Sequence, residues 1–464
     1  MFSNSTYVER RKVLKEKVGS GLLLIPGNEE APMNYPSNSY TYRQDSVFLY
    51  YFGLDRAGLF GVIDIDNDKD IIFGYDFTID DIVWMGPQPK IESSAKEVGV
   101  SETYPLEKLD DYLANAKSSG QKIHFLPQYR FQNMMRLEKL LGVNSSEVNE
   151  NTSGNFTKAV IEQRSIKTDD ELKEIEYAID ISYEMKTTAM RLTKPGMKER
   201  EIYGAIIGIA NSLGCGPSFP PICSVHGETL HNHNYENVMK DGELLLIDSG
   251  AESLLHYASD ITRTFPVNGK FTERQSDIYS IVLASQLRAI DSIQPDGKFK
   301  DVHLTAARVI TEGLKDIGLM KGDIDTAVEK GAHALFFPHG LGHAMGLDVH
   351  DLEGLGENFV GYDDKTKRSD QFGLAFLRFG KELRTGNVLT VEPGIYFIPE
   401  LIDQWKAENK HADFINYDKV EEYKNFGGIR IEDDIVVADS GCRILGSKII
   451  PKEINDVEAA CLSD

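Results

Sequence analysis

Two patterns of apolar positions divide the chain near residue 158. Before that point, short apolar runs alternate with turn residues, and four of them predict strands, at residues 21–26, 47–53, 58–64 and 70–74. Helical spacing of apolar residues follows at 106–116 and 131–141, and a polar cluster at 149–155 predicts a boundary loop. We therefore expect a mixed α/β domain over residues 1–158 and a second domain over residues 159–464.

The second part of the chain opens with long helical patterns. Thr168-Asp-Asp-Glu171 has the spacing of a capping box, and apolar residues at helical intervals follow it. A second capping box stands at Thr272–Gln275, again before a long helical pattern. Proline-containing turns follow the two helices, at Pro195 and, 100 residues later, at Pro295. This spacing predicts an internal repeat of two related α/β halves, with a site where the halves meet.

Length and composition limit the class of protein. At 464 residues the chain exceeds one ordinary core, and 41% hydrophobic and 27% charged residues are typical of globular proteins. The first 17 residues are polar, and the apolar run at 22–25 is far too short to cross a bilayer. We therefore expect a cytoplasmic protein with no membrane partner.

Charge and cysteine content exclude further classes. A net charge of −23 disfavours nucleic-acid binding, which needs clustered Lys and Arg. The four cysteines form no C-x-x-C pair, which indicates reduced thiols and excludes a cysteine-based zinc site. Any metal must then be bound by oxygen and nitrogen atoms.

One stretch, residues 337–350, holds three of the eleven histidines: His339, His343 and His350. Three glycines stand among them, which disfavours a plain helix and allows the backbone to approach a ligand closely. A single histidine would be expected merely to hydrogen-bond its neighbours. Three so close together favour a metal site or an acid–base site.

Four carboxylates stand in or beside apolar segments that predict strands. Asp248 ends one apolar run, Asp260 follows twelve residues later, and Glu392 and Glu432 lie in two further apolar segments. A salt-bridge network is an alternative for any one of them, but an unpaired buried carboxylate costs on the order of several kcal/mol. Together with one histidine, the four predict two divalent cations. Ligation by oxygen favours manganese, with iron, cobalt or zinc as alternatives.

These residues resemble the motifs of the pita-bread metallopeptidases, which include aminopeptidase P, prolidase and methionine aminopeptidase. Besides Asp248 and Asp260, the resemblance rests on the segments Pro338–His343, Thr390–Gly394 and Gly428–Glu432. The N-terminal part is similar to the domain that aminopeptidase P and prolidase carry and methionine aminopeptidases lack, as in Tyr42-Arg-Gln-Asp-Ser46. The chain is most similar to prolidase, the Xaa-Pro dipeptidase, over nearly its whole length.

The resemblance implies a fold, a metal site and a set of roles. The expected fold is an N-terminal α/β domain followed by a pita-bread catalytic domain with a pseudo-two-fold repeat. Two divalent ions, most simply Mn²⁺, would be held by Asp248, Asp260, His343, Glu392 and Glu432. A hydroxide would lie between the ions, and Glu392 would transfer its proton. Arg430 would orient the carboxylate ligands.

Substrate binding is also implied by the resemblance. His231 and His350 would donate hydrogen bonds to substrate and oxyanion, and His339 would also bind substrate. Arg378 would bind the terminal carboxylate of a dipeptide. Trp84 would reach the active site of a partner in a homodimer. The alternatives are a surface arginine for Arg378 and a local core residue for Trp84. The substrates would be small peptides with proline in the second position.

Three other functions remain as alternatives. An aminopeptidase P would cleave longer Xaa-Pro peptides with the same metals. A metal-free peptide- or protein-binding module would have lost ligands, and a dinuclear phosphoesterase would carry more histidines. One departure from the family pattern lies near the expected pocket, where Phe219 stands at a position usually held by tyrosine.

Overall fold

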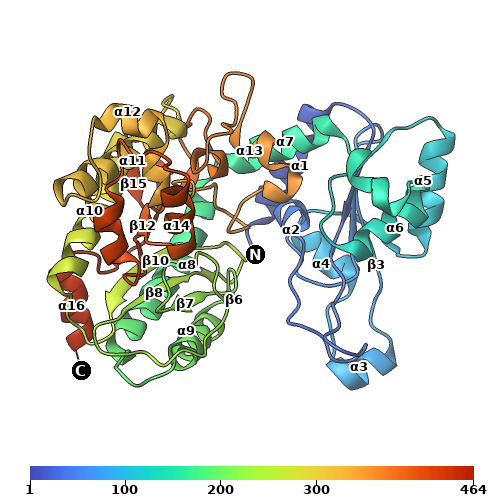
Figure 1. Cartoon of the computed structure of the whole chain (residues 1–464). Helices are drawn as coiled ribbons and strands as arrows, with labels where there is room; N and C mark the ends of the chain where they lie inside the picture. Colours follow the sequence, from blue (N-terminus) through green and yellow to red (C-terminus); the bar gives the residue numbers. More distant parts are fainter. Residues whose placement is uncertain (464) are drawn as a thin grey trace. The chain divides into compact units, whose positions relative to one another are not determined.

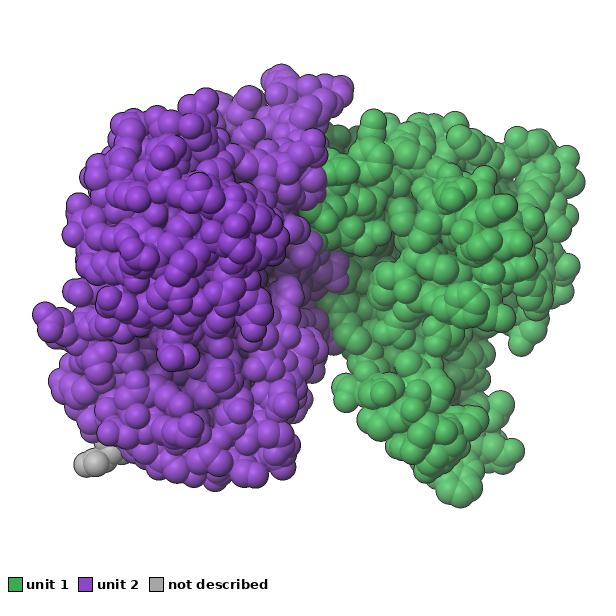
Figure 2. Space-filling model, viewed as in Figure 1, with its two compact units in different colours: residues 1–164, 352–359 green, residues 165–351, 360–464 purple. Residues whose placement is uncertain are grey.

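The structure is a computed structural model that describes residues 1–463 and falls into two compact units (Figure 2). Unit 1 holds residues 1–164 and 352–359. Unit 2 holds residues 165–351 and the chain from residue 360 onward.

A five-stranded mixed sheet forms the centre of unit 1, in the order β4-β3-β2-β1-β5. Its strands are β1 Leu22–Pro26, β2 Phe60–Asp64, β3 Lys69–Gly74, β4 Glu102–Pro105 and β5 Ile123–His124. The two inner pairings are antiparallel and the two outer ones parallel. Alternate apolar residues on β1, β2 and β3 pack against Leu109, Leu113 and Leu137, so one face of the sheet is buried beneath helices.

The helices of unit 1 lie beside this sheet, except for the one at Ile79–Met85, which lies away from it (Figure 1). They are α1 Asn4–Val18, α2 Ser46–Phe52, α3 Ile79–Met85, α4 Ile91–Glu97, α5 Lys108–Ser118, α6 Phe131–Leu141, α7 Gly154–Ser165 and the 3₁₀ helices η1 Ser145–Glu150 and η3 Glu353–Leu355. The helices predicted at 106–116 and 131–141 are confirmed as α5 and α6.

The strand predicted at 47–53 is wrong, because residues 47–52 fall in helix α2 and Gly53 caps its C-terminus. Asp45 caps this helix by accepting hydrogen bonds from the backbone of Val47 and Phe48, and Gly53 ends it with a left-handed φ of 61°. All seven residues of α2 are buried, so the run shows neither helical nor strand periodicity. Asp45, the residue that starts the helix, lies just before the apolar run.

Ten strands of unit 2 form two three-stranded and two two-stranded sheets. They are β6 Gly216–Pro217, β7 Ile222–Ser224, β8 Leu244–Ser249, β9 Ala251–Glu252, β10 Ile261–Pro266, β11 Val388–Val391, β12 Gly394–Tyr396, β13 Gly428–Arg430, β14 Asp433–Val437 and β15 Cys442–Ile444. The larger sheets have the orders β10-β8-β7 and β11-β14-β15.

Helices pack around these strands, and the short helix at 357–361 crosses from unit 1 into unit 2 along the chain. They are α8 Asp169–Leu192, α9 Glu199–Leu213, α10 Glu273–Ser292, α11 Phe299–Asp316, α12 Ile324–Glu329, α13 Glu357–Gly361, α14 Pro399–Ala407, α15 Tyr417–Val420, α16 Ile454–Leu462, and the 3₁₀ helices η2 Ala332–Leu335, η4 Leu374–Phe376 and η5 Glu421–Tyr423. No helix among residues 1–463 is both long and apolar enough to cross a membrane.

The predicted repeat and both predicted capping boxes are present in unit 2. Thr168 caps α8 and Thr272 caps α10, each in a reciprocal capping box. Each of these long helices pairs with the helix after it, α8 with α9 and α10 with α11. The second helix of each pair begins at a β-bridge, from Lys198 to Val238 and from Lys298 to Glu382. The fold is the expected N-terminal α/β domain followed by a pita-bread domain.

Candidate metal centre and substrate pocket

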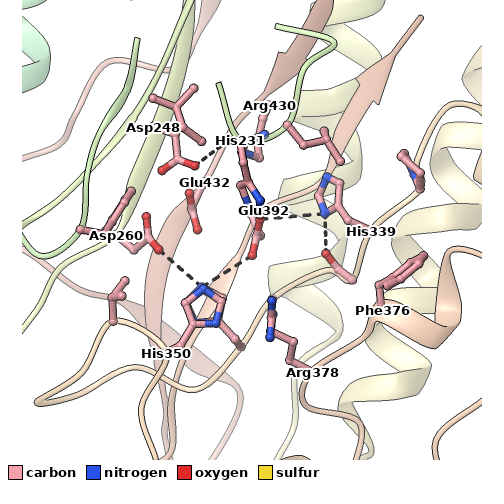
Figure 3. A pocket seen from close by; sticks show the side chains of 18 of the residues that line it. His231, Asp248, Asp260, His339, His350, Phe376, Arg378, Glu392, Arg430 and Glu432 are labelled. Atoms are coloured by element: carbon pink, nitrogen blue, oxygen red, sulfur yellow. Dashed lines mark hydrogen bonds and ion pairs between the residues drawn. The ribbon is translucent and has the colours of Figure 1, made fainter. Parts of the chain in front are cut away.

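A cavity of about 640 Å³ in unit 2 collects most of the predicted site residues. Carboxylates and histidines line one end, and aromatic and aliphatic side chains line the other (Figure 3). The predicted residues that line it are His231, Asp248, Asp260, His339, His343, His350, Arg378, Glu392, Arg430 and Glu432. Trp84 is not among them and lies in α3 of unit 1, 87% exposed.

Strand ends and strand junctions position the four carboxylates. Asp248 lies near the end of β8, and Asp260 directly precedes β10, its antiparallel neighbour. Glu392 stands between β11 and β12, and Glu432 between β13 and β14. We expected these two glutamates inside continuous strands, and instead each marks a break between two short ones. Side chains from distant parts of the chain thereby converge on one point.

Three of the predicted ligands form the closest cluster. One donor atom each from Asp260, His343 and Glu432 lies within 4.8 Å of the others, and all three residues are buried. The Nε2 atom of His343 is 3.4 Å from Asp260 Oδ2 and 3.8 Å from Glu392 Oε1. Its Nδ1 lies 3.1 Å from the carbonyl of Ala344, which favours a proton on Nδ1 and leaves the Nε2 lone pair for a metal.

Buried charge at this cluster fits a cation site. Asp248 Oδ1 and Asp260 Oδ1 are buried and have no hydrogen-bond partner within residues 1–463. Burial and neighbouring carboxylates raise the pKa of Asp260 and of Glu432 well above their usual range, and burial also raises the pKa of Glu392. A divalent cation would remove this penalty. Three or four carboxylates with one imidazole suit hard or borderline divalent ions.

Arg430 connects several of the site residues. Its guanidinium donates to Asp248 Oδ2 at 2.6 Å and to Tyr396 Oη at 2.9 Å. It also donates to Thr262 Oγ1 at 3.1 Å, and Thr262 in turn donates to Glu432 at 2.6 Å. This geometry suits the expected role of Arg430 in orienting the carboxylates.

The three histidines of the 337–350 run have different surroundings. His339 Nε2 lies 2.8 Å from Tyr396 Oη, and its Nδ1 lies 2.7 Å from the carbonyl of Gly340 and 4.0 Å from Glu392 Oε2. Burial lowers the pKa of His339 to about 3, which keeps the ring neutral. His350 stacks on His343 with ring centroids 3.8 Å apart. His350 therefore lies beside the ligand cluster, where it can face a substrate.

The other end of the pocket is built from loops. Arg378 follows η4, is partly exposed, and points into the pocket on the side of Phe376 (Figure 3). Phe376 is 54% and Phe372 38% exposed, and Phe219 also lines the cavity. His231 belongs to the exposed segment after β7. These side chains could contact an apolar substrate with a terminal charge.

Some residues at the site were not predicted from the sequence. Asp434 Oδ2 accepts a hydrogen bond from the backbone N–H of Asp260 at 3.0 Å, and Tyr396 joins Arg430 to His339. Both lie just beyond the motif segments Thr390–Gly394 and Gly428–Glu432. Their only signal is position, because Asp434 stands two residues after Glu432 and Tyr396 four after Glu392.

A buried site of carboxylates and one imidazole, at the junction of two α/β halves, defines the class as a metallohydrolase of the pita-bread type. The family is shown by comparison with known proteins. The model of metallopeptidase family M24 matches residues 173–439, and that of the aminopeptidase P N-terminal domain matches residues 7–124. The chain belongs to metallopeptidase family M24.

Relatives of both proline-specific kinds are similar over nearly their whole lengths. The Xaa-Pro dipeptidase of Rattus norvegicus is 35% identical, and the alignment covers 96% of this chain and 89% of the relative. The Xaa-Pro aminopeptidase of Haemophilus influenzae is 33% identical, with 95% and 92% covered. The structure of aminopeptidase P from E. coli with the inhibitor Pro-Leu is similar at a TM-score of 0.81 and 29% identity, covering 99% of this chain and 98% of that one.

Proposed function

We propose that the chain hydrolyses the Xaa-Pro bond of dipeptides. The observation that carries the proposal is that Arg378 lines the same cavity as the ligand cluster. A dipeptide carries its terminal carboxylate beside the proline ring, so a guanidinium in the same cavity suits it, whereas a longer peptide has no charge at that position. The name of the rat relative agrees with this specificity.

The donor atoms support the assignment of two divalent cations. Asp248, Asp260, His343, Glu392 and Glu432 would hold them, with manganese as the first choice. Bound there, two such ions supply an acidified water and polarise the scissile carbonyl. Side chains of the protein would carry out the proton transfer and bind the substrate.

Glu392 is suited to proton transfer in this reaction. The nitrogen of an Xaa-Pro bond carries no hydrogen. It leaves as the secondary amine of proline, so it must accept a proton when the bond breaks. Glu392 lines the cavity, with Oε1 3.8 Å from Nε2 of His343, and its carboxylate would take a proton from the attacking water and pass it to the proline nitrogen. His350 and His231 would donate hydrogen bonds to the carbonyl oxygen as it becomes negative.

A comparison of substrate lengths tests the proposal. The protein loaded with Mn²⁺ is given Ala-Pro and Ala-Pro-Ala, and kcat/KM is measured for each. We expect the dipeptide to be preferred by more than about tenfold, because only it pairs Arg378 with a carboxylate. A kcat/KM that favours the tripeptide would overturn the proposal.

An Xaa-Pro aminopeptidase is the second candidate. It is favoured by the exposed aromatic side chains at the Arg378 end, which leave room for a longer peptide. The Haemophilus influenzae relative carries that name. In this case Arg378 would contribute little to binding, and the tripeptide would be the better substrate.

We also propose that the protein forms a homodimer through helix α3. No residue of α3 is buried within the chain, and Ile79, Val83, Trp84 and Met85 are 75%, 72%, 87% and 53% exposed. So much exposed apolar surface on one short helix suits an interface. Light scattering should report a dimer for the native protein and a monomer for Trp84→Glu. A monomeric native protein at working concentration would contradict this proposal.

A further inference from the structure

Lys186 is a fully buried lysine in α8, behind the strands that carry the two aspartates. Its Nζ donates to the main-chain oxygen of Ser249 at 2.9 Å and also to Ser249 Oγ. Ser249 directly follows Asp248 in the chain. The lysine therefore fixes the backbone next to one of the predicted metal ligands, although it touches no substrate.

One helical turn earlier, Ser182 makes a corresponding contact beside Asp260. Ser182 Oγ is hydrogen-bonded to Ser259 Oγ at 2.9 Å, and Ser259 Oγ also contacts the carbonyl of Ala178 at 3.1 Å. Ser259 directly precedes Asp260. Residues four apart lie on the same face of a helix, so one face of α8 contacts the chain at both ends of the segment joining the aspartates.

We propose that Lys186 is a positioning residue of the metal site, which together with Ser182 sets the separation of Asp248 and Asp260. The inference rests on the metal site of the proposed function but not on its substrate. Without such contacts, two neighbouring buried carboxylates would repel each other and move apart. Gly250 shows how closely the segment is packed, because a Cβ there would lie 1.7 Å from the carbonyl oxygen of Ser259.

The charge of Lys186 and its positioning contacts should have opposite effects on the affinity for a metal ion, and this makes the proposal testable. Burial lowers the pKa of Lys186 to about 8, against the attraction of Asp248 and Asp260, so the side chain is a cation at neutral pH. By charge alone, removing it would strengthen the binding of Mn²⁺. If its contacts position the aspartates, removing it weakens that binding.

The experiment measures the affinity of the metal-free protein for Mn²⁺ by titration calorimetry. Lys186→Met keeps the length of the side chain but loses both the charge and the hydrogen bonds. The matched control is Lys173→Met, the same substitution on the same helix at a lysine whose side chain is 72% exposed. We expect Lys186→Met to raise the Kd at least about tenfold, as the loss of a contact behind a metal ligand usually does, and Lys173→Met to leave it unchanged.

Thermal unfolding with and without Mn²⁺ separates positioning from general stability. A purely structural role would lower Tm equally in both conditions, whereas a positioning role also reduces the increase in Tm that the metal produces. Lys186→Gln keeps a donor and should lie between the native protein and Lys186→Met. A Kd for Lys186→Met that is unchanged or lower than that of the native protein overturns the inference.

If Lys186→Met does not fold, Ser182→Ala and Lys186→Gln test the inference in its place. Ser182→Ala and Lys186→Gln should each raise the Kd about threefold, roughly the cost of one hydrogen bond. Native affinity in both would also overturn the inference. A native protein that binds no Mn²⁺ would instead remove the proposed metal site itself.

Discussion

The two ends of the pocket differ in how their side chains are held. At the metal end, Asp260, His343 and Glu432 are buried. Asp260 and Glu432 stand at strand ends, and the backbone of His343 is hydrogen-bonded to Thr390 of β11. At the other end, Arg378 and Phe376 are partly exposed and belong to a 3₁₀ helix and the loop after it. The difference suggests a division of labour, in which the metal end sets whether the reaction occurs and the loop end sets which peptide is accepted.

The largest effect is expected at the metal end. Asp260→Asn and Glu432→Gln each remove a carboxylate of the proposed metal site, so kcat should fall more than about 100-fold. Metal content, measured by elemental analysis, should fall as well. The metal-free protein should remain folded, because burial disfavours the charged carboxylates that these changes remove. Native activity in either variant would show that the cluster is not the catalytic centre.

A smaller and different effect is expected at the loop end. Arg378→Lys replaces a planar fork by a point charge, so KM for Ala-Pro should rise roughly thirtyfold, the equivalent of about 2 kcal/mol. Metal content should not change, because Arg378 is not a donor to the cluster. A loss of metal in this variant would mean that the two ends are not independent, and an unchanged KM would favour the aminopeptidase alternative.

The sequence predicts the residues that converge at the metal end better than the residues that hold them in position. The candidate ligands stand in short motifs, so the residues that converge in the cavity are visible without a structure. Lys186 and Asp434 are not, because their partners Ser249 and Asp260 lie 63 and 174 positions away along the chain, and neither type of residue suggests such a contact. The strand predicted at 47–53 is wrong for a different reason, because burial on all sides removes the periodicity that distinguishes a helix from a strand.

A fall in pH should change the free energy of unfolding in opposite directions through the metal end and through a pair of histidines elsewhere in unit 2. His303 and His333 are buried, none of their ring nitrogens has a hydrogen-bond partner within residues 1–463, and burial lowers their pKa values to about 3 and about 4. The folded rings stay neutral while the unfolded chain takes up protons below about pH 6.5. The pair therefore contributes stability above that pH that is lost as the pH falls toward 4.

The carboxylates of the metal end act with the opposite sign in metal-free protein. Their raised pKa values mean that the folded state holds protons more tightly than the unfolded state, so they gain stability as the pH falls. Urea unfolding of the metal-free protein and of His303→Phe, at pH 7 and pH 5, separates the two effects. As the pH falls from 7 to 5, we expect the free energy of unfolding of the native protein to decrease by on the order of 1 kcal/mol per pH unit relative to that of His303→Phe. Equal pH dependence would show that His303 is hydrated or paired.

The smallest effect concerns Phe376 at the loop end. This side chain is 54% exposed, so a substrate can cover only the part of it that faces the pocket. Phe376→Ala should then raise KM for an Xaa-Pro dipeptide about fivefold, which corresponds to roughly 1 kcal/mol of apolar burial. The matched control is Phe131→Ala in unit 1, where the side chain is 62% exposed and lines no part of the cavity. An effect on kcat or on metal content, rather than on KM alone, would contradict the division of labour between the two ends, because it would make a loop side chain part of the catalytic centre.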